Sequence, residues 1–182
     1  MNDHVTNNIY ESLGRLLKYP ETDQTLRLDD CVSGLDRADS TALDPVRRFV
    51  EGIRDASLEQ MQELYTRTFD INPVCALEVG WHLFGERYER GTFIVKMRQT
   101  LRQLGLTESA ELPDHLPHVL EALGKMDADE AGEFASMFVL PAVEKMLAGF
   151  EGKDNVYSNV LDGICREIKS RHNLSAQGVN NG

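Results

Sequence analysis

The chain has 182 residues with 19 basic and 30 acidic side chains, which gives a net charge of −11. A general nucleic-acid binder needs an extended basic face, so this composition argues against one and favours a cationic partner instead. The three cysteines, at positions 31, 75 and 165, form no CxxC pair, which excludes a zinc ribbon and a dithiol redox site. The polar N-terminus shows no secretion signal, and no apolar run reaches the ~18 residues that span a membrane, so a cytoplasmic protein is expected.

Apolar residues recur at helical spacing through the first third of the chain. Pro20 should end the first helix at Tyr19. Ser57 followed by Gln60 is a capping box, which should open a helix that continues to Phe69. The helices expected here cover residues 8–19, 22–31, 44–53 and 58–69, with a polar connection over residues 34–41.

The densest group of aromatic residues lies between positions 64 and 91. Residues 70–73 are typical of a break between helices, and Pro73 suits the first position of a new helix. After the break, apolar residues follow a broad helical stripe made of Val74, Leu77, Trp81 and Phe84. Such a stripe predicts the central helix of the domain, buried on most sides. The glycine spacing of residues 80–85 resembles a phosphate loop, but a glutamate stands where the lysine must be, so nucleotide binding is not expected there.

The second half of the chain is also helical in pattern, with Gly105 as a C-cap and Asp127 with Glu130 as a second capping box. Pro141 should kink or divide a long helix. The helices expected here cover residues 93–104, 116–126, 128–150 and 156–168, and the tail 173–182 should be disordered. No segment alternates as a strand does. The prediction is an all-α domain over residues 1–172, a bundle of roughly eight to ten helices without a sheet.

One loop, ELPDHLP at residues 111–117, stands out because two prolines flank an Asp-His pair. A loop that is both rigid and polar is suited to holding a peptide, with an acidic group for a cation and an apolar floor beside it. The alternative is a stiff corner between helices in which Asp114 is a helix cap. A second alternative is a metal-dependent hydrolase or nucleotide-binding helical protein that uses Glu111, His115 and His118, since two histidines three residues apart can share a metal.

Four stretches in this order resemble a known family: YESLGRLLKYP, LYTRTFD, HLFGERYERG and ELPDHLP. They are similar to the assembly chaperones of molybdenum oxidoreductases, in the respiratory nitrate reductase (NarJ-like) branch of the TorD/DmsD superfamily. The resemblance implies a non-catalytic protein that binds the N-terminal segment of an apo catalytic subunit, which carries a twin-arginine signal or its remnant. The client is a nitrate reductase or a related dehydrogenase.

The resemblance also implies that the chaperone acts before export or membrane docking, while the client receives molybdopterin guanine dinucleotide. That cofactor belongs to the client, so none is expected to be bound tightly here. Molybdenum cofactor biosynthesis proteins are further expected partners, whereas nucleic acid and a membrane span are not expected.

Carried over to this sequence, the resemblance predicts a peptide-binding site. Its residues are Tyr65, Phe69, Asp70, Trp81, His82, Arg87, Arg90, Glu111, Pro113, Asp114, His115 and Leu116. Asp114 and Glu111 are expected to meet the positive charge of the peptide. Leu116, Trp81 and Phe69 are expected to floor the groove, although the last two fit a core role equally well. His115 should set the shape of the loop, and the two arginines should touch the client or pair with acidic neighbours.

Overall fold

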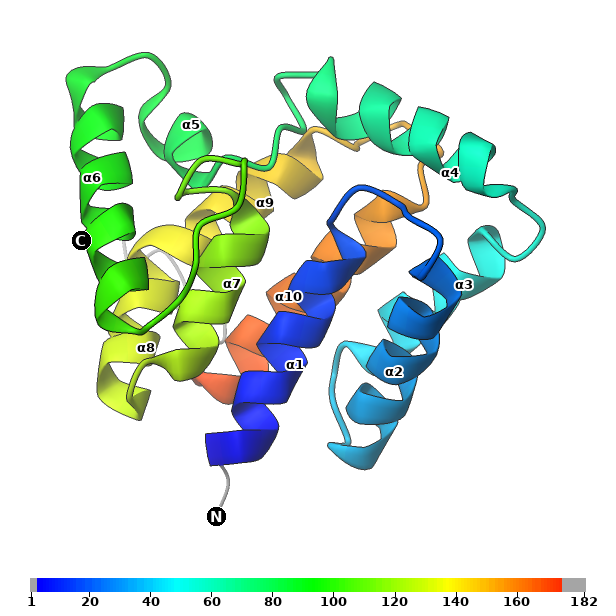
Figure 1. Cartoon of the computed structure of the whole chain (residues 1–182), viewed down its shortest axis with the longest axis horizontal. Helices are drawn as coiled ribbons and strands as arrows, with labels where there is room; N and C mark the ends of the chain where they lie inside the picture. Colours follow the sequence, from blue (N-terminus) through cyan, green and yellow to red (C-terminus); the bar gives the residue numbers. More distant parts are fainter. Residues whose placement is uncertain (1–2, 175–182) are drawn as a thin grey trace, which may run out of the picture.

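The computed structural model describes residues 3–174, with side chains from Ile9 onward, and most of this part is helical (Figure 1). The α-helices are α1 (Asp3–Leu16), α2 (Gln24–Arg37), α3 (Leu43–Gly52), α4 (Leu58–Tyr65), α5 (Val79–Phe84), α6 (Tyr88–Gln103), α7 (Leu116–Lys125), α8 (Ala128–Phe134), α9 (Leu140–Ala148) and α10 (Tyr157–Arg171). Two π-helical segments, Thr66–Asp70 and Ala135–Val139, continue α4 and α8. The described residues form no strand, only an isolated antiparallel bridge between Glu78 and His115. The all-α prediction is confirmed.

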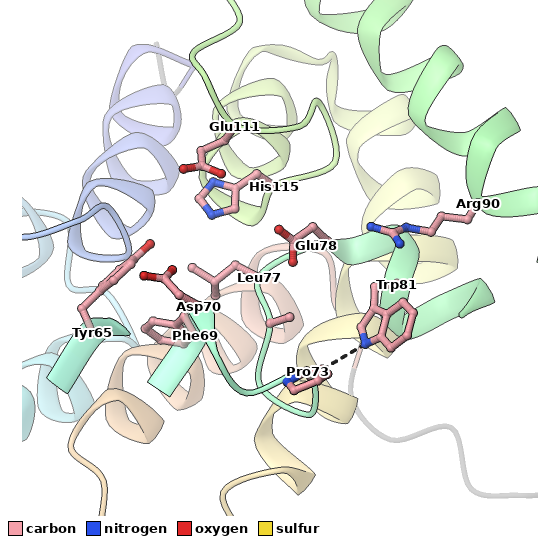
Figure 2. A pocket seen from close by; sticks show the side chains of 11 residues that line it. Tyr65, Phe69, Asp70, Pro73, Leu77, Glu78, Trp81, Arg90, Glu111 and His115 are labelled. Carbon is pink, nitrogen blue, oxygen red and sulfur yellow. Dashed lines mark hydrogen bonds between the residues drawn. The ribbon is translucent and has the colours of Figure 1, made fainter. Parts of the chain in front are cut away.

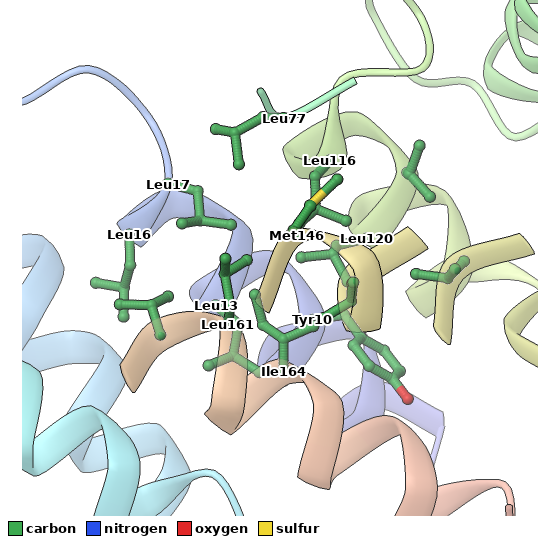
Figure 3. Packing of buried hydrophobic residues seen from close by; sticks show 14 of the residues in the cluster. Tyr10, Leu13, Leu16, Leu17, Leu77, Leu116, Leu120, Met146, Leu161 and Ile164 are labelled. Atoms are coloured by element: carbon green, nitrogen blue, oxygen red, sulfur yellow. The ribbon is translucent and has the colours of Figure 1, made fainter. Parts of the chain in front are cut away.

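Helix α1 lies in the middle of the bundle and packs against α7, α2 and α10 (Figure 1). Leu13 and Leu16 of α1, and Leu17 directly after it, are fully buried in the same core cluster as Leu116 and Leu120 of α7 (Figure 3). Burying one such side chain contributes about 1.5–3 kcal/mol. The N-terminal helix and α7 therefore form the centre of the core, and the loop before α7 is fixed to it.

The predicted central helix over residues 74–84 is wrong. Residues 71–78 form turns, α5 has only six residues, and Val74 is 56% exposed. The reason is that the backbone at Leu77 and Val79 finds hydrogen-bond partners in the loop before α7 and does not need helical ones. Apolar residues of the stripe such as Leu77 and Val79 are buried, but residues before α5 reach the core from turns and not from a helix.

The second helix also differs from the prediction, which ended it at residue 31 and started a polar connection at residue 34. Helix α2 continues to Arg37, and its buried face includes Arg27 and Cys31, whereas Leu26 is 66% exposed. Arg27 is buried because Glu21 and Asp23 both pair with it, at 2.8 Å each. A paired arginine can occupy an inward position that the pattern assigned to an apolar residue.

Of the two predicted capping boxes, the one at α4 is complete and the one at α8 has one of its two hydrogen bonds. At α4, Ser57 and Gln60 form both hydrogen bonds of the box. At α8, the Asp127 side chain accepts the Glu130 N–H, which is one half of the predicted box. Pro141, which has no N–H to donate, is the second residue of α9, and the second π-helical segment ends two residues before it, so the long helix is divided as predicted.

Two glycines bound the region of α6. Gly85 has φ +60° and turns the chain between α5 and α6, and Gly105 has φ +69°, as the predicted C-cap requires. Helix α6 begins at Tyr88, before the predicted position 93.

Across residues 3–174, no helix is both long and apolar enough to cross a membrane. The predicted disorder of 173–182 concerns residues that, apart from Asn173 and Leu174, lie outside the described part.

Candidate functional site

A cleft of about 400 Å³ opens where the end of α4, the turn before α5, the start of α6 and the loop before α7 meet (Figure 2). Parts of the chain far apart in sequence supply its walls. The lining residues are Tyr65, Phe69, Asp70, Pro73, Ala76, Leu77, Glu78, Trp81, Arg90, Glu111 and His115. The motifs LYTRTFD, HLFGERYERG and ELPDHLP, or residues directly beside them, therefore meet at one place.

The loop before α7 holds the start of α5 through Asp114. Its backbone carbonyl accepts the Val79 N–H at 2.9 Å, and its carboxylate Oδ2 accepts the Gly80 N–H at 3.0 Å. These N–H groups belong to the first turn of α5, where a helix offers no internal acceptor. Beside them the Leu116 N–H donates to the Leu77 carbonyl at 2.8 Å. The loop and the start of α5 are thus one hydrogen-bonded unit.

Asp114 itself is completely buried and does not line the cleft. Burial raises the pKa of its carboxyl, and the Gly80 N–H and the Arg90 guanidinium oppose that rise. Its other oxygen, Oδ1, is buried without a hydrogen-bond partner. The expectation that Asp114 meets a peptide's positive charge does not fit this position. The alternative, a capping aspartate, does fit, but the helix that it caps is α5 and not the α7 that follows it.

The end of α4 and the π-helical turn after it present an aromatic pair, Tyr65 and Phe69, to the cleft. The Tyr65 hydroxyl donates to the Leu17 carbonyl at 3.0 Å, which ties the cleft to the end of α1. The rings of Tyr65 and Phe69 meet edge-on at 5.1 Å, and Phe69 packs on Tyr157 at 4.8 Å. Both residues are buried and also line the cleft, so Phe69 belongs to the core and to the cleft lining at once. Asp70, the last residue of the turn, is exposed at the rim.

Trp81 stands half-buried on the opposite wall (Figure 2). Its indole N–H donates to the Pro73 carbonyl at 2.9 Å, which closes the turn before α5. The Arg90 guanidinium carbon lies 5.4 Å from the centre of the indole ring, a cation–π distance. Trp81 therefore belongs to the cleft wall and not to the core.

The lining carries more negative than positive charge. Three carboxylates, of Asp70, Glu78 and Glu111, line the cleft together with one guanidinium, that of Arg90. Burial raises the pKa of Glu78, and Glu111 is among the carboxylates that add to the rise. Burial lowers the pKa of His115 to about 4, so its ring is neutral at pH 7. An acidic rim with an aromatic floor suits a cationic, partly apolar ligand.

Besides Asp114, four predicted site residues lie outside the lining. The His82 ring nitrogen Nε2 contacts the Ala76 carbonyl at 2.6 Å behind the cleft wall. Arg87 donates to the carbonyls of Phe84 and Leu83 at the end of α5, and so caps that helix. Pro113 and Leu116 are buried, the latter in the central core. These residues support the cleft from behind and do not face it.

Four lining residues were missed: Pro73, Ala76, Leu77 and Glu78. All lie in the segment that was interpreted as a central helix, which would have turned them toward the core. The signal that could have found them is Glu78, a single acidic residue inside an otherwise apolar stretch.

The metal-site alternative lacks a ligand set in this geometry. The N–H of Ser109 points to His118 Nε2 at 3.3 Å, and the Leu112 carbonyl lies 3.0 Å from its Nδ1, so both ring nitrogens are already engaged. Across the described residues, no group of three or more His, Cys, Asp or Glu side chains is arranged to hold a metal ion.

The fold is shared with a protein of known structure. A solved structure described as a putative redox enzyme maturation protein from Archaeoglobus fulgidus superposes with a TM-score of 0.59 over 91% of each chain. At 19% sequence identity this likeness concerns the fold alone.

The sequence itself gives the family. Residues 33–159, more than half of the chain, match the family described as nitrate reductase delta subunit, and the chain belongs to that family. It is 27% identical over 163 residues to the probable nitrate reductase molybdenum cofactor assembly chaperone NarJ of Bacillus subtilis (strain 168), covering 88% of each chain. It is 31% identical over 102 residues to NarJ of Escherichia coli (strain K12), covering 56% of this chain and 43% of that one. The family predicted from the sequence motifs is confirmed.

Proposed function

We propose that the chain is an assembly chaperone that binds the N-terminal leader segment of an apo molybdoenzyme catalytic subunit, that of a nitrate reductase or a related dehydrogenase. It holds that subunit in the cytoplasm until molybdopterin guanine dinucleotide has been inserted, before export or membrane docking. The observation that carries the proposal is the acidic, aromatic-floored cleft in a chain of the nitrate reductase delta subunit family. The names of the Bacillus and Escherichia relatives support the class of client.

The size and chemistry of the cleft suit a short part of such a leader. A volume of about 400 Å³ holds a few side chains and not a folded domain. The apolar face of an amphipathic segment packs against Phe69 and Leu77, as in helix-in-groove recognition. Its basic side chains meet Asp70 and Glu111 at the rim, where charge mainly accelerates binding and makes it sensitive to salt.

The chain acts in this proposal by binding and release, without a reaction of its own. The molybdenum cofactor is cargo for the client, so no cleft residue is assigned to hold it. Proteins of molybdenum cofactor biosynthesis are further partners in the same assembly step.

Calorimetry with a synthetic peptide of about thirty residues, the length of a leader segment, tests the proposal. The peptide carries the N-terminal sequence of the nitrate reductase catalytic subunit from the same genome. Wild type is expected to bind it saturably, and the Asp70→Asn, Glu111→Gln double variant about 10-fold more weakly, because two charge-assisted contacts are lost.

Glu59→Gln is the matched control, because Glu59 is an exposed acid on α4 that does not line the cleft. It should bind as wild type does. Absence of saturable binding to wild type would refute the proposal. Equal losses of affinity in the control and in the double variant would show that the leader does not bind at Asp70 and Glu111.

A further inference from the structure

Arg90 is held in the cleft by unusually few contacts. Among the lining residues, all of them described, it is the one permanent cation. Its guanidinium lies over Trp81, and its Nε is buried without a hydrogen-bond partner. The ion pairs found in the described residues do not include it. A guanidinium has five N–H donors and normally uses several of them when it is removed from water.

Two carboxylates near Arg90 also lack an ion-pair partner: that of Glu78, which lines the cleft, and that of Asp114, which is buried outside the lining. Asp114 Oδ1 is buried and unpaired, and Glu78 forms no ion pair in the described part of the chain. Arg90 is near enough for its charge to oppose the rise in the pKa of both groups, but it bonds to neither. Arg90 and Glu78 thus line the cleft together, with the buried Asp114 carboxylate near them, and no ion pair forms among the three.

Gly80 makes this close approach possible. A β-carbon at position 80 would lie 2.7 Å from Asp114 Oδ2 and 3.4 Å from the Arg90 Cγ. The stem of Arg90 and the buried carboxylate therefore face each other across a residue that has no side chain. The space at Gly80 is too tight for a methyl group.

We propose that this end of the cleft is a subsite for a guanidinium of the client's leader, and that Arg90 occupies it until the leader arrives. The inference rests on the proposed function and adds which side chain of the client binds and at which residues of the cleft. The client's guanidinium stacks on Trp81 and donates a bidentate pair of hydrogen bonds to the Glu78 carboxylate, while Arg90 moves into solvent. Arginine is preferred to lysine because a planar guanidinium both stacks on an indole and matches a carboxylate.

The consequence is that removing Arg90 strengthens binding. In Arg90→Gln the leader no longer displaces an internal cation of the same charge, so its affinity should rise about 5- to 10-fold. The same leader with every arginine replaced by glutamine should show no gain, because it does not use the subsite. Lys96→Gln is the control, because this substitution also removes one positive charge from α6. Lys96 is exposed and does not line the cleft.

Calorimetry on the full chain, with both peptides and all variants, decides the matter, and circular dichroism confirms that each variant is folded. Glu78→Gln should weaken binding of the arginine leader and leave the glutamine leader unchanged. If wild type binds the leader but Arg90→Gln binds it equally or more weakly, the subsite is refuted and the proposed function stands. If no peptide binds wild type or variant, the proposed function fails and the subsite with it.

Discussion

Replacing Asp114 by alanine tests whether this residue builds the site or contacts the ligand. The structure gives its carboxylate one hydrogen bond, 3.0 Å from the Gly80 N–H, in a place without solvent access. Alanine leaves that N–H buried and unpaired, which costs about 1–3 kcal/mol of the free energy of unfolding. For a chain of this length, each kcal/mol lowers the Tm by about 2–4 °C.

The assay is thermal and urea unfolding followed by far-UV circular dichroism. Asp114→Asn retains an oxygen that can accept the Gly80 N–H and removes a charge whose burial is unfavourable, so it should stay closer to wild type. Asp70→Ala, at the exposed rim, should change the free energy of unfolding by less than about 0.5 kcal/mol. If Asp114→Ala were as stable as wild type, the capping role derived from the structure would be incorrect.

Three further predictions concern the walls of the cleft. Tyr65→Phe removes the hydroxyl that donates to the Leu17 carbonyl, and the carbonyl stays buried without a donor. The free energy of unfolding in urea should therefore fall by about 1–3 kcal/mol. An unchanged free energy of unfolding would show that this hydrogen bond does not link the cleft to the core. Gly80→Ala should lower the free energy of unfolding by about 1–3 kcal/mol, because its β-carbon would lie 2.7 Å from the Asp114 carboxylate. Gly91→Ala on α6, whose β-carbon would meet nothing within 4 Å, should raise the free energy of unfolding slightly. Equal effects of the two substitutions would contradict the packing around Gly80. As the pH falls from about 6.5 to about 4, the free energy of unfolding of wild type should drop by up to about 3 kcal/mol relative to that of His115→Gln. The reason is that His115 is protonated in the unfolded state over this range but not in the folded state. Parallel pH profiles of the two proteins would show that the ring is not buried as described.

The helical class and most helices could be predicted because apolar spacing and capping residues are local signals. The box at Ser57 and the C-cap at Gly105 are complete in the short stretches that carry them. The segment before α5 could not be predicted in the same way. Its backbone is paired with residues 114–116, and a partner that distant along the chain leaves no trace in local periodicity.

The site was predicted in outline and not in detail. The motifs supplied the aromatic wall and the rim acids, since such residues stand out in sequence. They did not distinguish Asp114, which is buried and caps α5, from Glu78, which lines the cleft. The difference between them depends on the pairing of residues 77–79 with residues 114–116, which are distant in sequence.

The most direct test of the central claim uses Trp81, the single tryptophan of the chain, which stands in the cleft wall. Its fluorescence is followed while a tryptophan-free leader peptide of the nitrate reductase catalytic subunit is added to the wild-type chain. The account predicts a saturable change with the same Kd as calorimetry, weakened in the Asp70→Asn, Glu111→Gln variant. Calorimetric binding that leaves the Trp81 signal unchanged, or a signal that the variant does not affect, would contradict it.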